Sequence, residues 1–511
     1  MARDKAYSPG WSRPAAPAFD RRRPGNLPVR LRGKRVIVPR PVVDTLRDGG
    51  GILPRSQAGT AGEPAAPAIR RLAQRATMGA TAGDIARIEE LGYNGWLAGQ
   101  LEYEFLDDSL LEDALADALP TIHMTPAQIL NSYSNNPAVP IFELITARLY
   151  RAVYSPRQLY ERMVTFWADH FHIALFSDAG YLLKPTDQRE VIRRHALGNF
   201  RELLHASAHS PAMLVYLTND SNVAGSPNEN YARELMELHT LGADRGYDQQ
   251  DVIEVARCFT GWTLEQAGSG FGRFRFDSAA HDDGEKIVLG RVIPAGGGVE
   301  DGERVLDILA DHVLTSKFIA EKLARYLWGY KPPTSIVNRA AEVFRSSDGD
   351  IKQVVKTILK RSRIRNAKPK LKRPFHLATS TARALGADIR TPFAVLQKLL
   401  DAGHLPYYWN PPNGYPDSEE YWSGFLLPRF NLGAELHSNR TGGMVPAEEL
   451  LAPGRSAAQI VDDIDRALFD QTMSETVRTT LRGFLDAAPI NAKRTREAIG
   501  LAVASPEFQT Y

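Results

Sequence analysis

The sequence predicts a mainly α protein: a multi-helix globular body with a small inserted β-hairpin and an extended N-terminal arm. Three observations support this class. Apolar residues recur at helical spacing from about residue 67 onward. Helix-start patterns recur in the same region, as at 155–158 (S-P-R-Q) and 226–229 (S-P-N-E). Hydrophobic residues make up 43% of the chain and charged residues 24%, which are the proportions of an ordinary globular protein.

The first 66 residues differ from the rest in composition. They are rich in Pro, Gly, Arg and Ala, and only residues 34–39 (K-R-V-I-V-P) have the pattern of a strand. We therefore expect residues 1–66 to form an extended or disordered arm. The body divides into a helical core at 67–270, an inserted hairpin and loop at 271–300, and a C-terminal helical region at 301–511 that packs on the same body.

Two segments interrupt the helical pattern. Phe274–Phe276 and Lys286–Leu289 lie between glycines in the insertion, and we expect them to pair as one hairpin. Residues 405–424 form an aromatic, proline-rich loop. This loop either packs over the helices or presents its rings to a sugar or a peptide.

The charge balance excludes one class of partner. The chain has 62 basic and 60 acidic residues, so no global field gathers nucleic acid, and we expect no nucleic-acid partner. The basic clusters Arg21–Arg23 and Lys368–Arg373 are expected to be solvated surface. The single cysteine, Cys258, is expected to be a small buried residue.

No apolar run approaches the roughly 18 residues that a membrane helix needs, so we expect no membrane span. The first 30 residues contain no apolar segment of the signal-peptide type. This pattern predicts a cytoplasmic protein.

Polar residues fall on the apolar faces of three predicted helices. His170 lies in the apolar stripe of 156–171, Glu234 lies in that of 227–241, and both His195 and Asn199 lie in that of 187–205. Because His195 and Asn199 are four residues apart, we expect them to stack on one face. A buried carboxylate or imidazole needs a partner, so these groups either pin the helices together as a polar core or form a functional site.

Two further patterns concern charge. His281 and Asp282 lie in the inserted segment and have the residue types of a divalent-metal site, although a simple Asp-Gly turn explains them as well. Arg233 is expected to pair with Glu237, four residues later on the same helix.

These residues belong to blocks that resemble one family, called domain of unknown function 1800. The blocks are Phe166–Phe171 (F-W-A-D-H-F), His195–Phe200 (H-A-L-G-N-F), Pro211–Leu214 (P-A-M-L), Pro227–Gly242 (P-N-E-N-Y-A-R-E-L-M-E-L-H-T-L-G), Tyr247–Asp251, Glu254–Arg257 (E-V-A-R), Phe259–Trp262 (F-T-G-W), His281–Asp282 and Ser505–Phe508 (S-P-E-F). The resemblance implies a helical bacterial protein and no established activity. It also implies that export is an alternative to a cytoplasmic location. A partner similar to the alkaline phosphatase and sulfatase superfamily is implied in the same way.

Two functions remain open. The first is a hydrolase for a small-molecule or carbohydrate ligand, with a His/carboxylate or metal-assisted site. Its catalytic candidates are His170, His195, Glu234 and Arg233, its binding candidates are Asn199, Asn230 and Trp262, and the candidate ligands of one divalent metal are His170, His281 and Asp282. The second is a non-enzymatic binding or assembly protein for an envelope or polysaccharide-associated partner. In that case the polar core is sealed from solvent.

Overall fold

The structure is a computed structural model that describes residues 66–177, 180–435, 444–445 and 453–511. Contacts divide the chain into Met1–Arg35 and Val36–Tyr511, and every described residue belongs to the second unit. The expected N-terminal arm, its strand at 34–39 and the cluster Arg21–Arg23 lie outside the described residues. The predicted boundaries at 270 and 300 stay a prediction.

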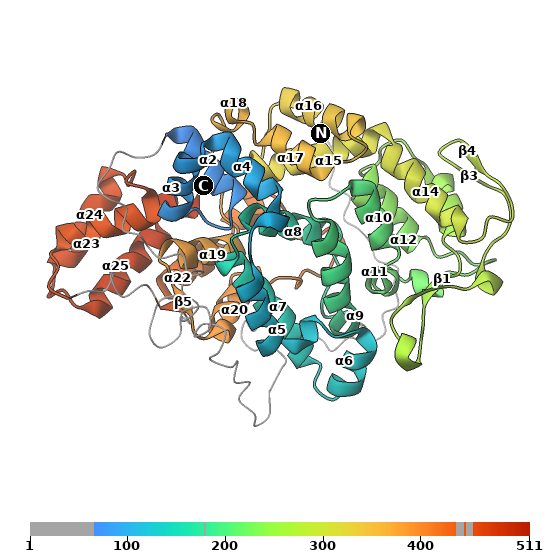
Figure 1. The fold of residues 1–511 in the computed structure, drawn as a ribbon, viewed down its shortest axis with the longest axis horizontal. Coiled ribbons are helices and arrows are strands. Elements are labelled where there is room, and N and C mark those ends of the chain that lie inside the picture. The colour runs from blue at the N-terminus through green and yellow to red at the C-terminus, as the bar shows by residue number, and fades with distance from the viewer. Residues whose placement is uncertain (1–65, 178–179, 436–443, 446–452) are drawn as a thin grey trace. The chain divides into compact units, whose positions relative to one another are not determined.

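The described residues are helical over most of their length, which confirms the mainly α class (Figure 1). The first helices are α2 (Pro67–Ala76), α3 (Ala82–Leu91), α4 (Tyr93–Leu101), α5 (Ser109–Ala118), α6 (Pro126–Tyr133), α7 (Ala138–Tyr154) and α8 (Gln158–His170). Next come α9 (Gly180–Asp187), α10 (Phe200–Ala208), α11 (Pro211–Tyr216), α12 (Glu229–Glu234) and α13 (Gln249–Cys258).

The second half of the chain is also mainly helical. Its helices are α14 (Glu300–Asp311), α15 (Val313–Leu327), α16 (Thr334–Ser346), α17 (Ile351–Ile358), α18 (Arg361–Ile364), α19 (Pro374–Ala384), α20 (Pro392–Asp401), α21 (Glu419–Ser423) and α22 (Leu426–Glu435). The last are α23 (Ala457–Ile464), α24 (Glu475–Asp486), α25 (Ala492–Ala504) and α26 (Pro506–Gln509). Among the described residues, no helix is both long and apolar enough to cross a membrane.

Wider π-helical turns extend three helices. They are η3 (Gln188–Arg193) after α9, η5 (Leu235–Thr240) after α12 and η9 (Asp465–Phe469) after α23. A π turn adds a residue to the helical repeat, so side chains after it rotate to a different face, and such turns are frequent at functional sites. Short 3₁₀ turns are η1 (Tyr103–Phe105), η2 (Pro120–Ile122), η4 (Asn219–Ser221), η6 (Gly268–Gly270) and η7 (Ser278–Ala280).

The strands form antiparallel pairs, and one expected pairing is wrong. β2 (Phe274–Phe276) pairs with β1 (Trp262–Leu264), and β3 (Lys286–Val288) pairs with β4 (Arg291–Ile293). Residues 262–293 therefore form two hairpins, and the first of them begins before the predicted insertion. The reason lies at Leu289 and Gly290, whose φ angles of 49° and 72° make the tight two-residue turn that joins neighbouring strands. A further pair, β5 (Asp388–Ile389) with β6 (Met444–Val445), was not predicted.

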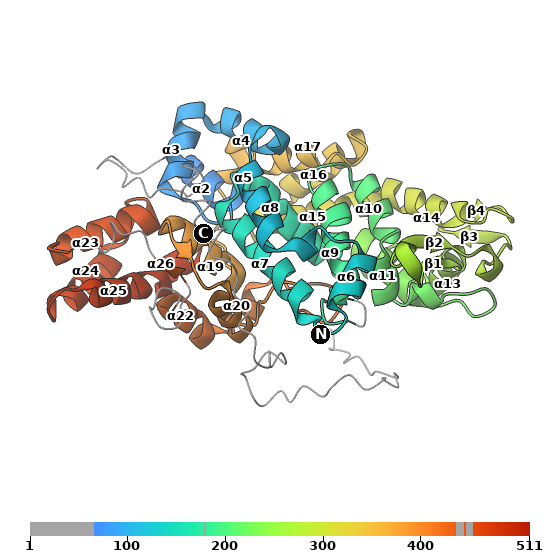
Figure 2. The same ribbon diagram turned by 60° about the horizontal axis from the view of Figure 1, so that its bottom comes forward.

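The start and the end of the described body lie side by side. Figure 1 and Figure 2 both show α2 and α3 beside the C-terminal helices, and the guanidinium of Arg70 on α2 lies 3.8 Å from the carboxylate of Asp470 just after η9. The buried aromatic residues Trp167, Trp262 and Trp422 come from the first, middle and last parts of the chain. The described residues thus share one extended hydrophobic core.

Candidate functional site

The predicted helix 187–205 is interrupted, so His195 and Asn199 do not stack. The π turn η3 and a turn after His195 end this helix, and Asn199 begins α10 as its N-cap. The side chain of Asn199 accepts the backbone N–H of Arg201 at 2.8 Å and donates to the carbonyl of Asp348. His195 is half-buried and lies 3.7 Å from Glu202. Asn199 therefore caps a helix.

His170 lies at the end of α8 and is buried, as expected, but its partners are not the predicted ones. Its Nε2 donates to the carbonyl of His239 at 3.1 Å, and its Nδ1 accepts from the Nζ of Lys322 at 2.8 Å. Burial, followed by the charge of Lys322, holds the pKa of His170 well below its usual range. His170 is therefore a neutral joint between α8, η5 and α15.

Glu234 is half-buried and forms no hydrogen bond or ion pair with the described residues. Burial raises the pKa of its carboxyl to about 7, and the charge of Glu237 adds to this effect. Arg233 pairs with Glu229 at 2.8 Å, so its expected pairing with Glu237 is wrong. Asn230 donates to the carbonyl of Leu217 at 3.0 Å.

Trp262 and His281 are core residues. Trp262 is fully buried between the rings of Phe259 and Phe274. His281 is 7% exposed, and its Nε2 lies 3.2 Å from Asp301, which also pairs with Lys286 at 2.5 Å.

The three expected metal ligands do not converge, although Thr260 contacts both His281 and the backbone N–H of Asp282. Asp282 forms an ion pair with Arg257 at 2.8 Å, whereas His170 and His281 have the partners given above. Among the described residues, no group of three His, Cys, Asp or Glu side chains is placed to hold a metal ion. Cys258 is buried, as expected, and burial raises the pKa of its thiol to about 12.

The aromatic loop 405–424 packs over the end of α8. His172 bonds the carbonyl of Trp409 at 2.6 Å, and Tyr216 donates to the carbonyl of Asn410 at 2.5 Å. Gly414 approaches so closely that a Cβ there would lie 2.0 Å from the carbonyl oxygen of Asp169. The loop therefore covers the helices, which is one of the two expected alternatives.

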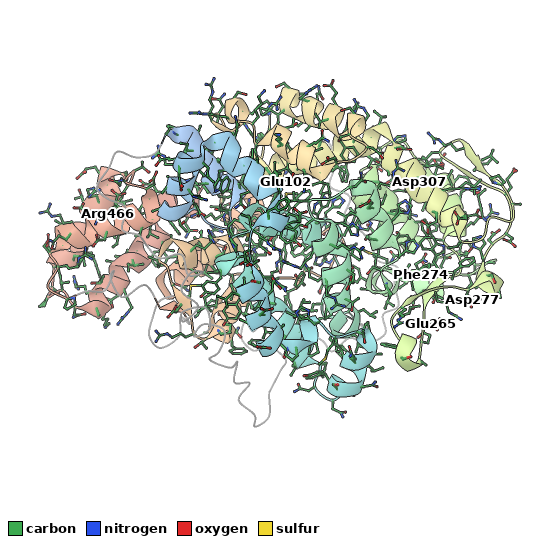
Figure 3. All side chains as sticks on the ribbon, in the orientation of Figure 1. Glu102, Glu265, Phe274, Asp277, Asp307 and Arg466 are labelled. Atoms are coloured by element: carbon green, nitrogen blue, oxygen red, sulfur yellow. The ribbon has the colours of Figure 1, made fainter. Side chains whose placement is uncertain are left out.

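A cavity of about 370 Å³, which we call the basic pocket, lies between the first and last helices. Its walls come from α2, the start of α3, the segment before α19, η9 and α26. The residues that line it are Pro67, Arg70, Arg71, Gln74, Ala80, Thr81, Ala82, Ile85, Pro369, Lys372, Arg466, Ala467, Leu468, Phe469, Asp470, Thr472, Glu507, Phe508, Thr510 and Tyr511. Figure 3 labels one of them, Arg466, on the C-terminal helices. Segments from both ends of the sequence thus build one pocket.

Cations outnumber carboxylates in the basic pocket. Arg466 pairs with Asp463 and Arg70 lies near Asp470. Arg71 and Lys372 have no carboxylate partner among the described residues. Arg71 bonds only the side chain of Gln74, at 3.3 Å, and the Nζ of Lys372 lies 3.5 Å above the ring of Phe508.

Burial makes the charged forms of Arg71 and Lys372 less favourable. Burial, followed by the charge of Arg429, lowers the pKa of Lys372 to about 7. Burial, followed by the charge of Arg70, lowers the pKa of Arg71. A bound anion favours the charged forms of both groups, so the pocket has the electrostatics of an anion site.

Tyr511 also lines the pocket and lies among the cations Arg162, Lys370 and Arg75. Its hydroxyl accepts a hydrogen bond from Arg162 at 3.2 Å, and the guanidinium of Arg75 lies 4.4 Å from its ring centre. Burial raises the pKa of Tyr511, but Arg162, Lys370 and Arg75 together outweigh burial and bring it down to about 8. The Tyr511 hydroxyl therefore loses its proton at a lower pH than an ordinary tyrosine does.

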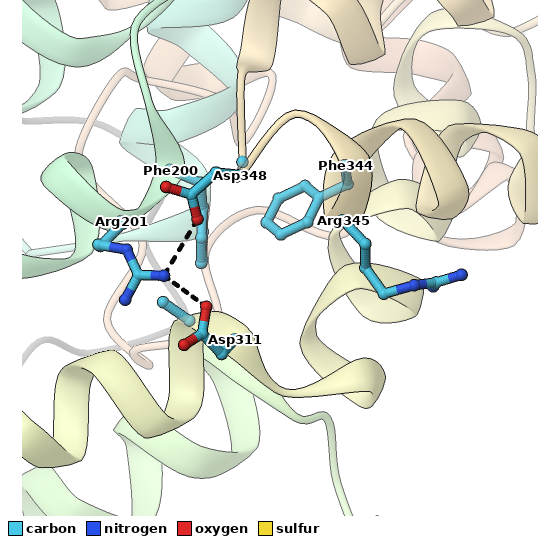
Figure 4. Close-up of a pocket in the computed structure, with 8 residues that line it drawn as sticks. Phe200, Arg201, Asp311, Phe344, Arg345 and Asp348 are labelled. Atoms are coloured by element: carbon cyan, nitrogen blue, oxygen red, sulfur yellow. Dashed lines mark hydrogen bonds and ion pairs between the residues drawn. The ribbon is translucent and has the colours of Figure 1, made fainter.

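A smaller cavity of about 110 Å³ lies where α10, α14 and the end of α16 meet (Figure 4). Arg201 reaches across it to Asp311 and Asp348, and it also pairs with Asp307 at 2.7 Å. Three carboxylates already compensate this guanidinium, so the smaller cavity does not attract an anion.

The comparisons with known proteins identify the family. The family model described as "Protein of unknown function (DUF1800)" matches residues 71–510, so the chain belongs to this family. No curated protein and no solved structure matches the chain. Arg71 and Thr510, the two limits of the matched region, both line the basic pocket.

The basic pocket was not predicted. The cluster Lys368–Arg373 was expected to be solvated, yet Lys370 and Lys372 are only 2% and 7% exposed, while Lys368 is exposed. The alternation of lysines in K-P-K-L-K-R was an available signal, because an extended segment buries every second side chain. Residues 70, 372 and 466 lie far apart in the sequence, so no sequence pattern indicated that they line one cavity.

Proposed function

We propose that this protein binds an amphiphilic anion in the basic pocket. The observation that carries the proposal is that two cations, Arg71 and Lys372, have no carboxylate partner among the described residues and lie in one cavity of about 370 Å³. Small-molecule sites have volumes of roughly 300–1,000 Å³. This proposal develops the expectation of a non-enzymatic binding protein.

The two kinds of lining define the ligand class. An acid group between Arg71 and Lys372 receives charge-assisted hydrogen bonds. An aromatic or aliphatic body then covers the apolar wall of Ile85, Phe469 and Phe508. Inorganic phosphate has no apolar body to cover the apolar wall, and a neutral hydrocarbon has no acid group for the two cations.

A fluorescence titration with anilinonaphthalene sulfonate tests the proposal, because this dye joins an anionic group to an apolar body. Replacement of one charged partner of a hydrogen bond costs about 1.5–3 kcal/mol, so we expect Lys372→Met to weaken dye binding about tenfold or more. The matched control is Lys360→Met, since Lys360 is exposed and lies outside the pocket. Equal dye affinity in the two variants contradicts the proposal.

The same titration has a predicted pH dependence. The pKa of Lys372 is about 7 without ligand, so its charged fraction falls as the pH rises from about 6 to about 8. An anion prefers the charged amine, and we expect affinity to fall over this interval and to become pH-independent in Lys372→Met. A wild-type affinity that rises with pH contradicts the assignment of Lys372.

One observation favours a second candidate function, hydrolysis with Glu234 as general acid. Its carboxyl is half-buried and bonds no described residue, and its pKa of about 7 leaves a large fraction of it protonated near neutral pH. A panel of chromogenic glycosides and esters tests this candidate. Turnover that is lost in Glu234→Gln and kept in Glu237→Gln supports it, and turnover that both variants keep contradicts it. The phosphatase-like partner and the cytoplasmic location stay predictions.

A further inference from the structure

Lys322 lies on α15 with its amine against the joint formed by His170. Its Nζ is 2.8 Å from the Nδ1 of His170, and the Nε2 of His170 donates to a backbone carbonyl. His170 therefore has its proton on Nε2 and a lone pair on Nδ1 that faces the amine. The side chain of Lys322 is half-buried, so part of it reaches solvent.

No carboxylate of the described residues lies within ion-pair distance of Lys322. The acids of this region are already paired: Asp169 binds Arg373 at 2.6 Å, and Asp417 binds Lys370 at 2.7 Å. Burial, opposed by the more distant charges of Asp169 and Asp417, lowers the pKa of Lys322 to about 8. An amine in such surroundings is uncharged far more often than a surface lysine.

A second polar group near His170 has a nitrogen that no described residue bonds. His239, on η5, is 1% exposed, and its Nε2 forms no hydrogen bond with the described residues. The ring of His239 lies beside that of His170, with ring centres 6.1 Å apart, so His239 and Lys322 both neighbour His170. Burial, followed by the charge of Lys322, lowers the pKa of His239 to about 3. Buried polar atoms are normally bonded, so this nitrogen marks a position for a ligand atom.

We propose that Lys322 is a nucleophilic amine that condenses with a small aldehyde or ketone. The free amine attacks the carbonyl carbon, a C=N bond forms, and the carbonyl oxygen leaves as water together with the two amine hydrogens. His170 positions the amine through its Nδ1. His239, with its proton on Nε2, donates to the carbonyl oxygen during the attack. The rings of Phe171 and Phe318 line the surroundings and favour a small, weakly polar ligand.

Reductive alkylation of the wild-type protein with limiting propanal and cyanoborohydride, at about pH 7, tests the proposal. Peptide mass spectrometry resolves each lysine. The internal control is Lys317, which is exposed on the same helix. The difference in free-amine fraction predicts that Lys322 reacts at least about tenfold faster than Lys317. The ratio of the rate at Lys322 to the rate at Lys317 is also expected to fall as the pH rises above about 8, because the free-amine fraction of Lys322 then stops growing.

Equal or slower labelling of Lys322 relative to Lys317 overturns the proposal. A tenfold preference for Lys322 that does not change with pH also overturns it, because the amine is then not the titrating nucleophile. The assignment of Lys322 does not depend on the basic pocket, because mass spectrometry measures the labelling of Lys372 in a different peptide. Neither result changes the interpretation of the dye titration.

Discussion

At the scale of single residues, two of the four polar side chains on predicted apolar faces bond to the backbone. Asn199 caps α10, and His170 joins two elements through a carbonyl. Helical periodicity found these residues because they are buried or half-buried. It did not separate structural from functional roles, since both require a partner.

Asn199 gives a clear test of this distinction. Asn199→Ala removes the acceptor of two backbone N–H groups at the start of α10. We expect a loss of about 1–2 kcal/mol in the free energy of unfolding, measured by urea denaturation, and unchanged dye affinity. Asn338→Ala, at an exposed position inside α16, is the control and is expected to cost nothing. Unchanged stability with lost binding of the dye contradicts a capping role.

At the scale of elements, the predictions that failed concern the interruption of helices. The spacing of apolar residues in 187–205 predicts one continuous helix, but the π turn η3 and the N-cap at Asn199 divide this segment. A second π turn, η5, follows Glu234 and turns His239 into the core beside His170. Local spacing does not predict a π turn, because tertiary packing stabilises the extra residue. Local spacing does match the start of α13, where Asp248 and Asp251, three residues apart, form a capping box.

The aromatic loop provides a prediction at this scale. Gly414→Ala places a Cβ 2.0 Å from the carbonyl oxygen of Asp169 at a φ of +67°. Gly290→Ala is the matched control, because Gly290 has a φ of +72° and open space around it. A left-handed alanine costs roughly 1–2 kcal/mol at either site. We expect Gly414→Ala to lose at least about 2 kcal/mol more in urea unfolding, since backbone must move. Equal losses in the two variants contradict the close packing of the loop on α8.

At the scale of the whole molecule, five buried histidines predict instability in acid. His170, His172, His239, His376 and His404 all have pKa values lowered chiefly by burial, to about 4 for His172 and about 3 for His239. The unfolded chain binds protons at these sites below about pH 6.5, whereas the folded chain does not. The contribution of these histidines to the free energy of unfolding is therefore fully present above about pH 6.5 and is lost as the pH falls.

Groups with a raised pKa act in the opposite direction. Burial raises the pKa of Glu143, Asp169, Asp220 and Asp465, and hydrogen bonds, chiefly that to Glu303, outweigh burial and raise the pKa of His209. Two carboxyls have the largest such shifts. Burial raises the pKa of Asp108 and of Glu234 to about 7, so the folded chain binds protons there that the unfolded chain does not bind until the pH is lower. Each unprotonated buried histidine contributes roughly 1.4 kcal/mol per pH unit in the lower part of this window, and the histidines outnumber the two carboxyls with the largest shifts. We expect urea midpoints to fall steadily from about pH 6.5 to about pH 5. Midpoints that rise over this interval contradict the burial of these imidazoles in neutral form.

The meeting of the first and last helices is also a property of the whole molecule. The basic pocket needs residues from α2, the segment before α19, η9 and α26, which are hundreds of residues apart. The sequence predicted the helices that supply these walls, together with the family block Ser505–Phe508. It did not predict the pocket, because no local pattern states which distant cations share a cavity.

Photoaffinity labelling with para-azidobenzoate is the most direct test of the basic pocket, since this probe is an amphiphilic anion that marks the residues it touches. Peptides are identified by mass spectrometry after irradiation, with and without excess anilinonaphthalene sulfonate. We predict that label concentrates on peptides from residues 67–85, 465–472 and 507–511 and that the dye suppresses it. Label spread over other peptides, or label in these peptides that the dye leaves unchanged, would contradict an anion site between the first and last helices.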